Sequence, residues 1–102
     1  MKHFSYLIDP GVICGRENNQ DLFIRKTVFD AGYIESEFHN HPNSYEFYLI
    51  LKGNLKFANK TEEIIAKEGS IVYFEEAELH KIAEVSQKVT MLLIKKVGAT
   101  KS

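Results

Sequence analysis

The sequence predicts an all-β fold, either a sandwich or a barrel, with little or no helix. Three observations lead to this prediction. Short segments rich in apolar, aromatic and β-branched residues recur along the chain. Turns containing glycine, asparagine or proline separate these segments at short intervals. No stretch has a convincing helical periodicity of apolar residues.

Eight segments are expected to be strands because each is bounded by turn residues and has strand-like composition. In chain order they are residues 22–29, 33–39, 45–51, 55–58, 62–66, 71–74, 80–85 and 89–95. Lys52-Gly53-Asn54 predicts a tight hairpin turn between the third and fourth of them. Residues 1–20 are expected to form an arm with one or two short strands, and residues 97–102 a polar tail.

The composition is that of an ordinary globular protein, and its 102 residues predict a single domain, 1–102. The net charge of −1 argues against nucleic-acid or membrane partners, which select a basic surface. Cys14 is the one cysteine, so no intrachain disulfide is possible, which fits a reducing compartment. The N-terminal residues contain no sustained apolar run, so neither a signal peptide nor a membrane span is expected. We therefore expect a cytoplasmic protein.

His39 and His41 are the residues most suggestive of chemistry. Two residues apart on an extended strand, they would point to the same face with Cα atoms about 6.5–7 Å apart. Two imidazoles at that separation can share one ion at metal–nitrogen distances of about 2.0–2.1 Å. This hypothesis needs the strand predicted at residues 33–39. The alternative is that each histidine is an ordinary surface or hydrogen-bonded core residue.

A longer pattern surrounds the histidine pair. It consists of Gly32, His39, His41, Glu46 and Gly53, with four residues between His41 and Glu46 and six between Glu46 and Gly53. This block resembles the first signature motif of the cupin superfamily. It departs from that motif by one extra residue between Gly32 and His39.

A second block resembles the second cupin motif in a degraded form. Gly69 and His80 match the motif, whereas Glu75, Ala77 and Glu84 stand where it has proline, glycine and asparagine. Fifteen residues separate the two blocks, which is the short linker typical of small microbial cupins. The resemblance covers residues 32–84, about half of the chain. It implies a jelly-roll (double-stranded β-helix) barrel.

By this resemblance, the metal ligands are His39, His41, Glu46 and His80. Three imidazoles and a carboxylate suit one divalent ion of iron, manganese, nickel, cobalt or zinc, and residue types do not rank these metals. Four protein ligands leave two positions of an octahedral ion open for a bidentate substrate, or for substrate and dioxygen. His3 has no partner in register and is expected to be an inert, solvated side chain.

Other side chains near the motifs are weaker candidates. Tyr48, and Tyr73 or Phe74 before His80, could orient a ligand or move a proton, although core packing is the favoured role for each aromatic residue. Arg25 could face the pocket and bind an anionic substrate, although such an arginine more often lies on the solvent face. Three acidic residues are expected to form a solvated rim, with one of them a possible base: Glu75, Glu76 and Glu78.

Two segments, 45–51 and 89–95, carry apolar residues on both faces. In a small barrel the outer face of such strands needs a cover. A second subunit would supply it, so a homodimer is expected, as is common among cupins. The alternative is that the N-terminal arm covers this face.

Three functions are compatible with these features. The first is a metalloenzyme similar to cupin dioxygenases, isomerases or lyases that act on small oxygenated or sugar-like molecules. The second is a small-ligand binding or sensing module, resembling the ligand-binding barrels of the arabinose-regulator type. The third is a barrel whose metal is structural. The full ligand set with open positions favours the enzyme, with a small molecule as its substrate.

Overall fold

The computed structural model describes residues 1, 9–15, 21–41 and 43–97. All regular structure in this part of the chain is β-strand. The strands are β1 (Gly11–Cys14), β2 (Leu22–Phe29), β3 (Ser44–Lys52), β4 (Leu55–Asn59), β5 (Glu63–Ala66), β6 (Ile71–Phe74), β7 (His80–Glu84) and β8 (Val89–Val97). Within these ranges, no helix is long and apolar enough to cross a membrane.

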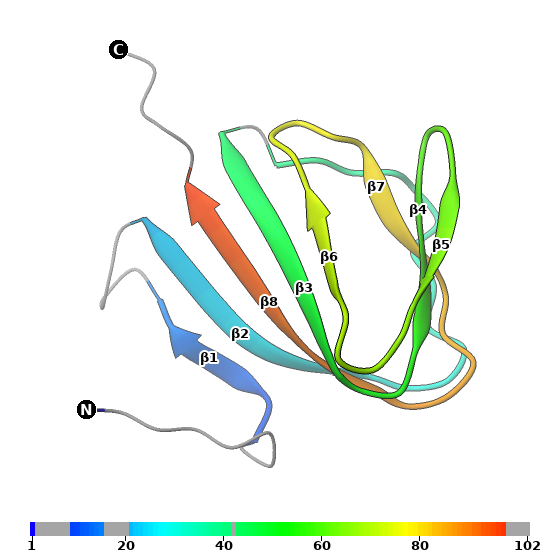
Figure 1. The fold of residues 1–102 in the computed structure, drawn as a ribbon, viewed down its shortest axis with the longest axis horizontal. Coiled ribbons are helices and arrows are strands. Elements are labelled where there is room, and N and C mark those ends of the chain that lie inside the picture. Colours follow the sequence, from blue (N-terminus) through cyan, green and yellow to red (C-terminus); the bar gives the residue numbers. More distant parts are fainter. Residues whose placement is uncertain (2–8, 16–20, 42, 98–102) are drawn as a thin grey trace.

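The strands form two antiparallel sheets that face each other (Figure 1). The larger sheet has the order β1-β2-β8-β3-β6, and the smaller one has the order β5-β4-β7. In the larger sheet, β2 from the first third of the described chain pairs with β8 from its end. The pairing runs along the whole length of β2, from Leu22↔Lys96 to Phe29↔Val89. The predicted all-β jelly-roll class is therefore confirmed.

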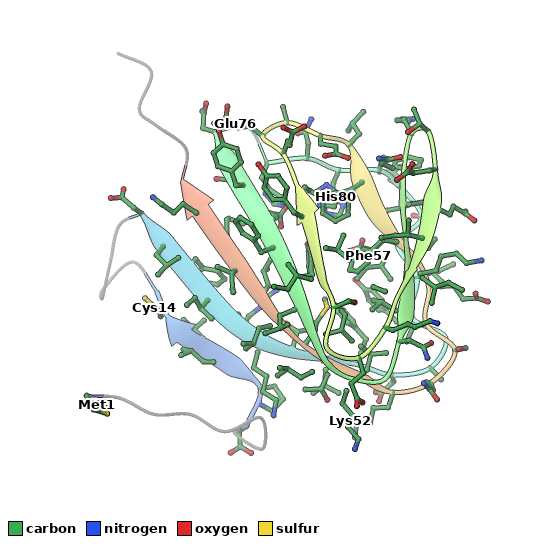
Figure 2. All side chains as sticks on the ribbon, in the orientation of Figure 1. Met1, Cys14, Lys52, Phe57, Glu76 and His80 are labelled. Atoms are coloured by element: carbon green, nitrogen blue, oxygen red, sulfur yellow. The ribbon has the colours of Figure 1, made fainter. Side chains whose placement is uncertain are left out.

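The core lies between the sheets because alternate side chains of each strand point inward. In β3, Tyr48 and Ile50 are buried, whereas Phe47 and Leu49 on the opposite face are half-buried. Figure 2 shows Phe57 pointing into the space between the sheets and Lys52 pointing away from it. The buried core consists of Tyr48, Ile50, Leu55, Phe57, Ala66, Val72, Phe74, Ile82, Val85, Val89, Met91 and Leu93.

Seven of the eight predicted segments form strands whose ends lie within two residues of the expected ones. Segments 22–29 and 71–74 match at both ends. The predicted N-terminal arm contains one short strand, β1, which extends the larger sheet beside β2. Residues 2–8 and 16–20 of the arm and 98–102 of the tail lie outside the described residues, and residue 97 ends β8.

The strand predicted at residues 33–39 is wrong. This segment follows β7 in an extended but irregular course, with Glu35 N donating to Ile82 O at 3.0 Å and His39 N donating to His80 O at 3.0 Å. A regular antiparallel ladder bonds every second residue. Here the two bonds are four residues apart, with bends at residues 36 and 37 between them. Only a single bridge, between His39 and His80, remains of the predicted strand.

The hairpin predicted at Lys52-Gly53-Asn54 is also wrong, because β3 and β4 belong to different sheets. The turn carries the chain from the larger sheet to the smaller one. Gly53 has φ 82°, and a Cβ at this position would lie 2.7 Å from the backbone oxygen of Lys88. Both the positive φ and the close approach of the β7–β8 connection require glycine here.

Candidate metal centre

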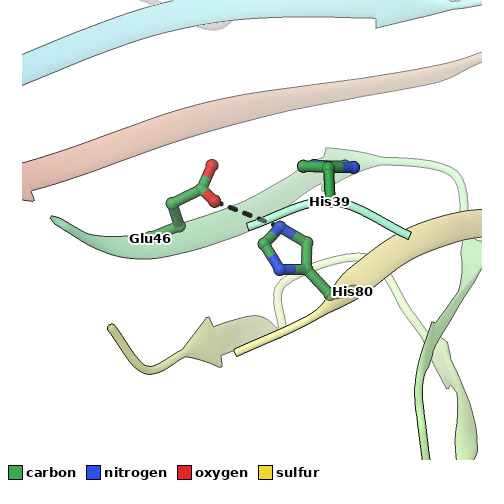
Figure 3. Close-up of side chains that lie close together, drawn as sticks. All are labelled: His39, Glu46 and His80. Atoms are coloured by element: carbon green, nitrogen blue, oxygen red, sulfur yellow. Dashed lines mark ion pairs between the residues drawn. The ribbon is translucent and has the colours of Figure 1, made fainter. Parts of the chain in front are cut away.

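Glu46 and His80 form the buried half of the site. Glu46 lies in β3, on the inward face, and His80 is the first residue of β7 in the facing sheet. Each residue is 2% exposed. Glu46 Oε1 and His80 Nε2 are 3.1 Å apart, and the dashed line in Figure 3 marks this contact. Phe74 stacks on the His80 imidazole with ring centroids 4.0 Å apart, which fixes the plane of the ring.

The hydrogen bonds around this pair leave two lone pairs facing each other. His80 Nδ1 lies 2.8 Å from the backbone oxygen of Glu78, which can only accept, so Nδ1 carries the proton and Nε2 of the neutral ring has the lone pair. The Tyr48 hydroxyl donates to the other Glu46 oxygen, Oε2, at 3.0 Å. With the His80 ring neutral, Glu46 Oε1 and His80 Nε2 are therefore buried without a hydrogen-bond partner, whereas a protonated ring would donate from Nε2 to Glu46. A metal ion satisfies such a pair, so these residues fit one.

His39 adds a third donor from a loop. Its backbone exchanges two hydrogen bonds with the backbone of His80, at 3.0 and 2.9 Å. The imidazoles of the two residues have centroids 4.4 Å apart. One nitrogen or oxygen from each of His39, Glu46 and His80 lies within 4.8 Å of the others. The next residue, Asn40, donates from Nδ2 to the backbone oxygen of Ala77 at 3.3 Å and so ties this loop to the turn before His80.

His41 lies at the edge of the group. Its Nε2 is 3.5 Å from Glu46 Oε1, and its Nδ1 is 3.4 Å from Lys95 Nζ. The rings of His39 and His41 have centroids 5.5 Å apart, so they lie near each other although the backbone between them is not a strand. Of the four residues that the motifs indicate, the structure gathers three into one compact cluster and places the fourth beside Glu46.

Burial and neighbouring charges shift the acid–base behaviour of these side chains. Burial lowers the pKa of His80, but the contacts with Glu46 and with the Glu78 carbonyl raise it more, so the net shift is upward. Burial raises the pKa of Glu46, but His80 and His41 lower it to a net value below the ordinary one. Burial and the Lys95 ammonium lower the pKa of His41 against the opposing charge of Glu46. The His41 ring is therefore neutral at neutral pH, with one nitrogen able to accept or to bind a metal.

Tyr48 both packs in the core and orients a candidate ligand, Glu46. Its ring packs against Phe57 and Phe74, with centroids 5.0 and 5.9 Å away. Burial, followed by the charge of Glu46, raises the pKa of Tyr48 far above its usual range. The phenol therefore stays protonated and donates to Glu46. Such a hydroxyl holds a carboxylate in place and does not serve as a base.

A cavity of about 260 Å³ opens beside the cluster. Its walls are polar near the histidines and apolar deeper between the sheets. The lining residues are Arg25, Thr27, Phe29, Tyr33, Glu35, His39, His41, Glu46, Tyr48, Ile82, Met91, Leu93 and Lys95. Arg25 thus faces the cavity, which is one of the two positions considered for it. The residue also remains exposed to solvent.

Sequence reasoning missed Glu35 and Lys95. Glu35 Oε1 accepts a hydrogen bond from the backbone N–H of Ile82 at 2.7 Å and lies 3.9 Å from His39 Nδ1. Lys95 lies directly opposite Glu46 in the β3–β8 register. Each had a signal in the sequence. Glu35 precedes His39 by four residues, and Lys95 continues the inward alternation of Met91 and Leu93 with a cation.

Two other groups of candidates lie away from the site. Tyr73 is 44% exposed on the outer face of β6, where it stacks on Phe47 with centroids 4.8 Å apart, so it does not reach the centre. The acidic residues before His80 belong to a turn, in which Glu78 accepts hydrogen bonds from Glu75 N and Asn59 Nδ2 at 3.0 Å each. They do not line the described cavity. His3 lies outside the described residues.

The fold and the cluster match a known family. A family model described as the cupin domain matches residues 26–95, which is more than half of the chain. The chain therefore belongs to the cupin family, whose members usually bind a metal ion. None of the curated protein sequences is similar enough to the chain to count as a relative.

Solved structures with similar folds share little sequence with the chain. A cupin protein from Bacteroides fragilis is 16% identical with a TM-score of 0.78, and the match covers 100% of this chain and 87% of that one. A predicted oxalate decarboxylase from Thermotoga maritima is 18% identical with a TM-score of 0.78, covering 95% and 99%. Ectoine synthase from P. lautus is 14% identical with a TM-score of 0.74, covering 89% and 64%. At these identities the likeness establishes the fold alone.

Proposed function

We propose that the protein is a divalent-metal-dependent enzyme acting on a small oxygenated molecule, with dioxygenase-, isomerase- or lyase-like chemistry. Its metal ligands are His39, Glu46, His80 and, from the more exposed edge, His41. The observation that carries the proposal is the buried pair of lone pairs on Glu46 Oε1 and His80 Nε2, 3.1 Å apart and without a hydrogen-bond partner. An ion bound there would supply Lewis-acid polarisation of a substrate carbonyl or hydroxyl.

The surrounding residues hold these donors in the form that a metal needs. The Glu78 carbonyl keeps the proton of His80 on Nδ1, so Nε2 is the free donor. The Tyr48 hydroxyl takes one oxygen of Glu46 and leaves the other directed at the centre. Glu35, itself anchored by Ile82 N, lies beside the Nδ1 edge of His39. These contacts pre-organise the donor set before any ion binds.

The open side of the centre favours catalysis over a structural role. Structural metal sites are closed by protein ligands, whereas catalytic sites keep a position open for water or substrate. The side chains of His39 and His41 are 35% and 38% exposed and line the cavity. Two of the structural neighbours described above bear enzyme names, a predicted oxalate decarboxylase and ectoine synthase. Their names support a small-molecule reaction, and they leave its type open because one fold hosts many chemistries.

The test combines metal analysis with a substrate screen. Purified protein, loaded anaerobically with each of the five candidate metals in turn, is expected to hold one equivalent, measured by elemental analysis. Dioxygen uptake is then followed with catechols, diketones and thiols, and product formation with sugar-like substrates, using His80→Ala as the metal-free control. Tight sugar binding without turnover would instead support the sensing module. Unfolding on chelation, with no ligand found, would support the structural metal.

We also propose that a second copy of the chain covers the outer face of the larger sheet. Phe47 and Leu49 are half-buried there, and Ile71 and Tyr73 of β6 are 63% and 44% exposed. Adjacent apolar side chains of this kind favour an interface. Light scattering is expected to give a dimer for the wild type and a monomer for Ile71→Arg. Ile65→Arg, at a residue 60% exposed on β5 of the smaller sheet, is the matched control and should stay dimeric.

A further inference from the structure

Two cations in the described part of the chain line the cavity beside the candidate metal centre: Arg25 of β2 and Lys95 of β8. In the β2–β8 register Arg25 lies opposite Leu93, so Lys95 is its diagonal neighbour on the same inward face. Diagonal neighbours in an antiparallel pair are roughly 7–8 Å apart at their Cα atoms. Both long side chains can therefore contact one small ligand from the same wall of the cavity.

The carboxylates that line the same cavity are held by other groups. Glu35 accepts from Ile82 N at 2.7 Å through Oε1 and from the Tyr33 hydroxyl at 3.2 Å through Oε2. Glu46 accepts from the Tyr48 hydroxyl and directs its second oxygen at His80. Both carboxylates are thus engaged by hydrogen-bond donors other than Arg25 and Lys95. They leave the cavity beside these two cations open to a ligand.

The surroundings of Arg25 suit the recognition of an anion. Its guanidinium carbon lies 6.0 Å above the centroid of the Phe23 ring, and the residue is exposed at the mouth of the cavity. An aromatic ring beneath a guanidinium restrains its plane while leaving the N–H groups at its edge available. Those N–H groups match the spacing of two oxygens of a carboxylate or a phosphate.

The contact between Lys95 and His41 links anion recognition to the metal. Lys95 Nζ lies 3.4 Å from His41 Nδ1, so in this state the imidazole accepts from the ammonium. If His41 ligates a metal through Nε2, which faces Glu46, the proton of the neutral ring must lie on Nδ1. An N–H group cannot accept from an ammonium. Ligation by His41 would therefore release Lys95 into the cavity.

We infer that the cavity binds a small anionic molecule, bearing a carboxylate or phosphate group, through Arg25 and Lys95. The inference rests on the proposed function for the role of the metal, which would hold the reacting end of the same molecule. The cavity of about 260 Å³ limits that molecule to a few heavy atoms beyond the anionic group. Arg25 and Lys95 would set specificity, and the metal cluster would remain intact without them.

The experiment is a calorimetric titration of the zinc-loaded protein with three probes: malonate, methyl phosphate and the neutral malonamide. At least one anion is expected to bind, and malonamide at least about tenfold more weakly. Whichever anion binds more tightly identifies the anionic group. Arg25→Gln and Lys95→Met should each weaken anion binding by roughly tenfold or more, since each loses a charged hydrogen bond. Lys96→Met removes the neighbouring exposed cation of β8 and should leave the affinity unchanged.

Equal anion affinity in Arg25→Gln, Lys95→Met and the wild type would overturn the inference, because it would show binding through zinc alone. Malonamide binding as tightly as malonate, or no binding of either anion, would also overturn it. Zinc content is measured in every sample. A wild-type protein that takes up none of the five candidate metals contradicts the proposed function, and the same titrations on the metal-free protein then decide the anion site separately.

Discussion

The two segments that build the candidate centre differ in an instructive way. The first, residues 32–53, keeps nearly every residue of its motif, yet it supplies its histidines from an irregular loop where they are more than a third exposed. The second, residues 69–84, departs from its motif at three positions, yet it holds His80 buried at the start of a strand. Agreement with a motif and burial of the ligand are therefore separate properties.

Ala77 shows how the second segment keeps its shape. It stands where the motif has glycine, and its φ of 64° is the left-handed conformation that glycine adopts without strain. The turn before His80 retains its backbone because other contacts hold it, including the Asn40 side chain on the Ala77 oxygen and Glu78 on Glu75 N. The turn thus adopts the left-handed conformation although the residue that usually permits it is absent.

The largest expected effect tests the difference between the histidines of the compact cluster, His39 and His80, and His41 at its edge. His80→Ala and His39→Ala should abolish stoichiometric metal binding, because loss of a ligand exceeds the about 10- to 100-fold cost of losing a partner outside the coordination sphere. His41→Ala removes the ligand at the edge of the site and should keep one equivalent of metal with weaker affinity, because the three clustered donors remain. Elemental analysis and metal-competition titrations measure both. Equal losses of metal binding in all three variants would contradict the distinction between His41 and the clustered histidines. Circular dichroism checks that each variant is folded.

Gly53→Ala tests the segment that keeps its motif. The new Cβ would meet the Lys88 carbonyl, a backbone atom, at 2.7 Å, and φ would stay at 82°. We expect the free energy of unfolding to fall by about 2 kcal/mol or more, from the strained conformation and the clash together. Urea denaturation of the metal-free protein measures this loss. A midpoint unchanged from the wild type would mean that the turn between the sheets tolerates a side chain.

Ala77→Gly tests the segment that departs from its motif and should stabilise the protein. Relief of the left-handed strain outweighs the entropy that glycine loses on folding, for a net gain of about 0.5–1 kcal/mol. The control is Ala58→Gly in β4, which is regularly paired with both neighbouring strands, so glycine should cost at least about 0.5–1 kcal/mol there. Both changes in the free energy of unfolding are read from denaturant midpoints. A loss of stability in Ala77→Gly would contradict the strain argument.

The smallest effect concerns protonation in the metal-free protein. His80 should titrate above the ordinary pKa of 6.5 and His41 below it, as followed by imidazole resonances in NMR spectra. The stabilisation from charged His80 is complete below 6.5 and is lost as pH rises through its folded pKa. His41 acts in the opposite direction, since the unfolded chain takes up its proton first as pH falls below 6.5. The reverse order of titration would contradict the assigned environments.

Much of the fold follows from local patterns. Segments such as 22–29 and 71–74 were predicted to the residue because alternation, β-branched composition and flanking turn residues agree there. The predicted strand at 33–39 fails because its alternating pattern reflects only an extended course along β7. The ladder is interrupted by bends at residues 36 and 37, which depend on the fit to another strand.

The candidate site divides in the same way. The resemblance of two blocks of the sequence to the cupin motifs nominated a metal centre of His39, His41, Glu46 and His80, because the histidine pair alone is a weak signal. Glu35 and Lys95 escaped notice because a charged residue on a strand has two possible faces. Only the pairing of β8 with β3 and the course of residues 32–39 along β7 turn these two side chains toward the cavity.

The sequence by itself determined most of the strand segments and the all-β class, because these depend on short-range periodicity, and its resemblance to the cupin motifs nominated the four candidate donors. The tertiary structure decided which strands pair, that the turn at Gly53 joins two sheets, and that His41 stands at the edge beside Lys95. Those outcomes depend on contacts between residues far apart in the chain. Their free energies come from burial and hydrogen bonding that no local pattern contains.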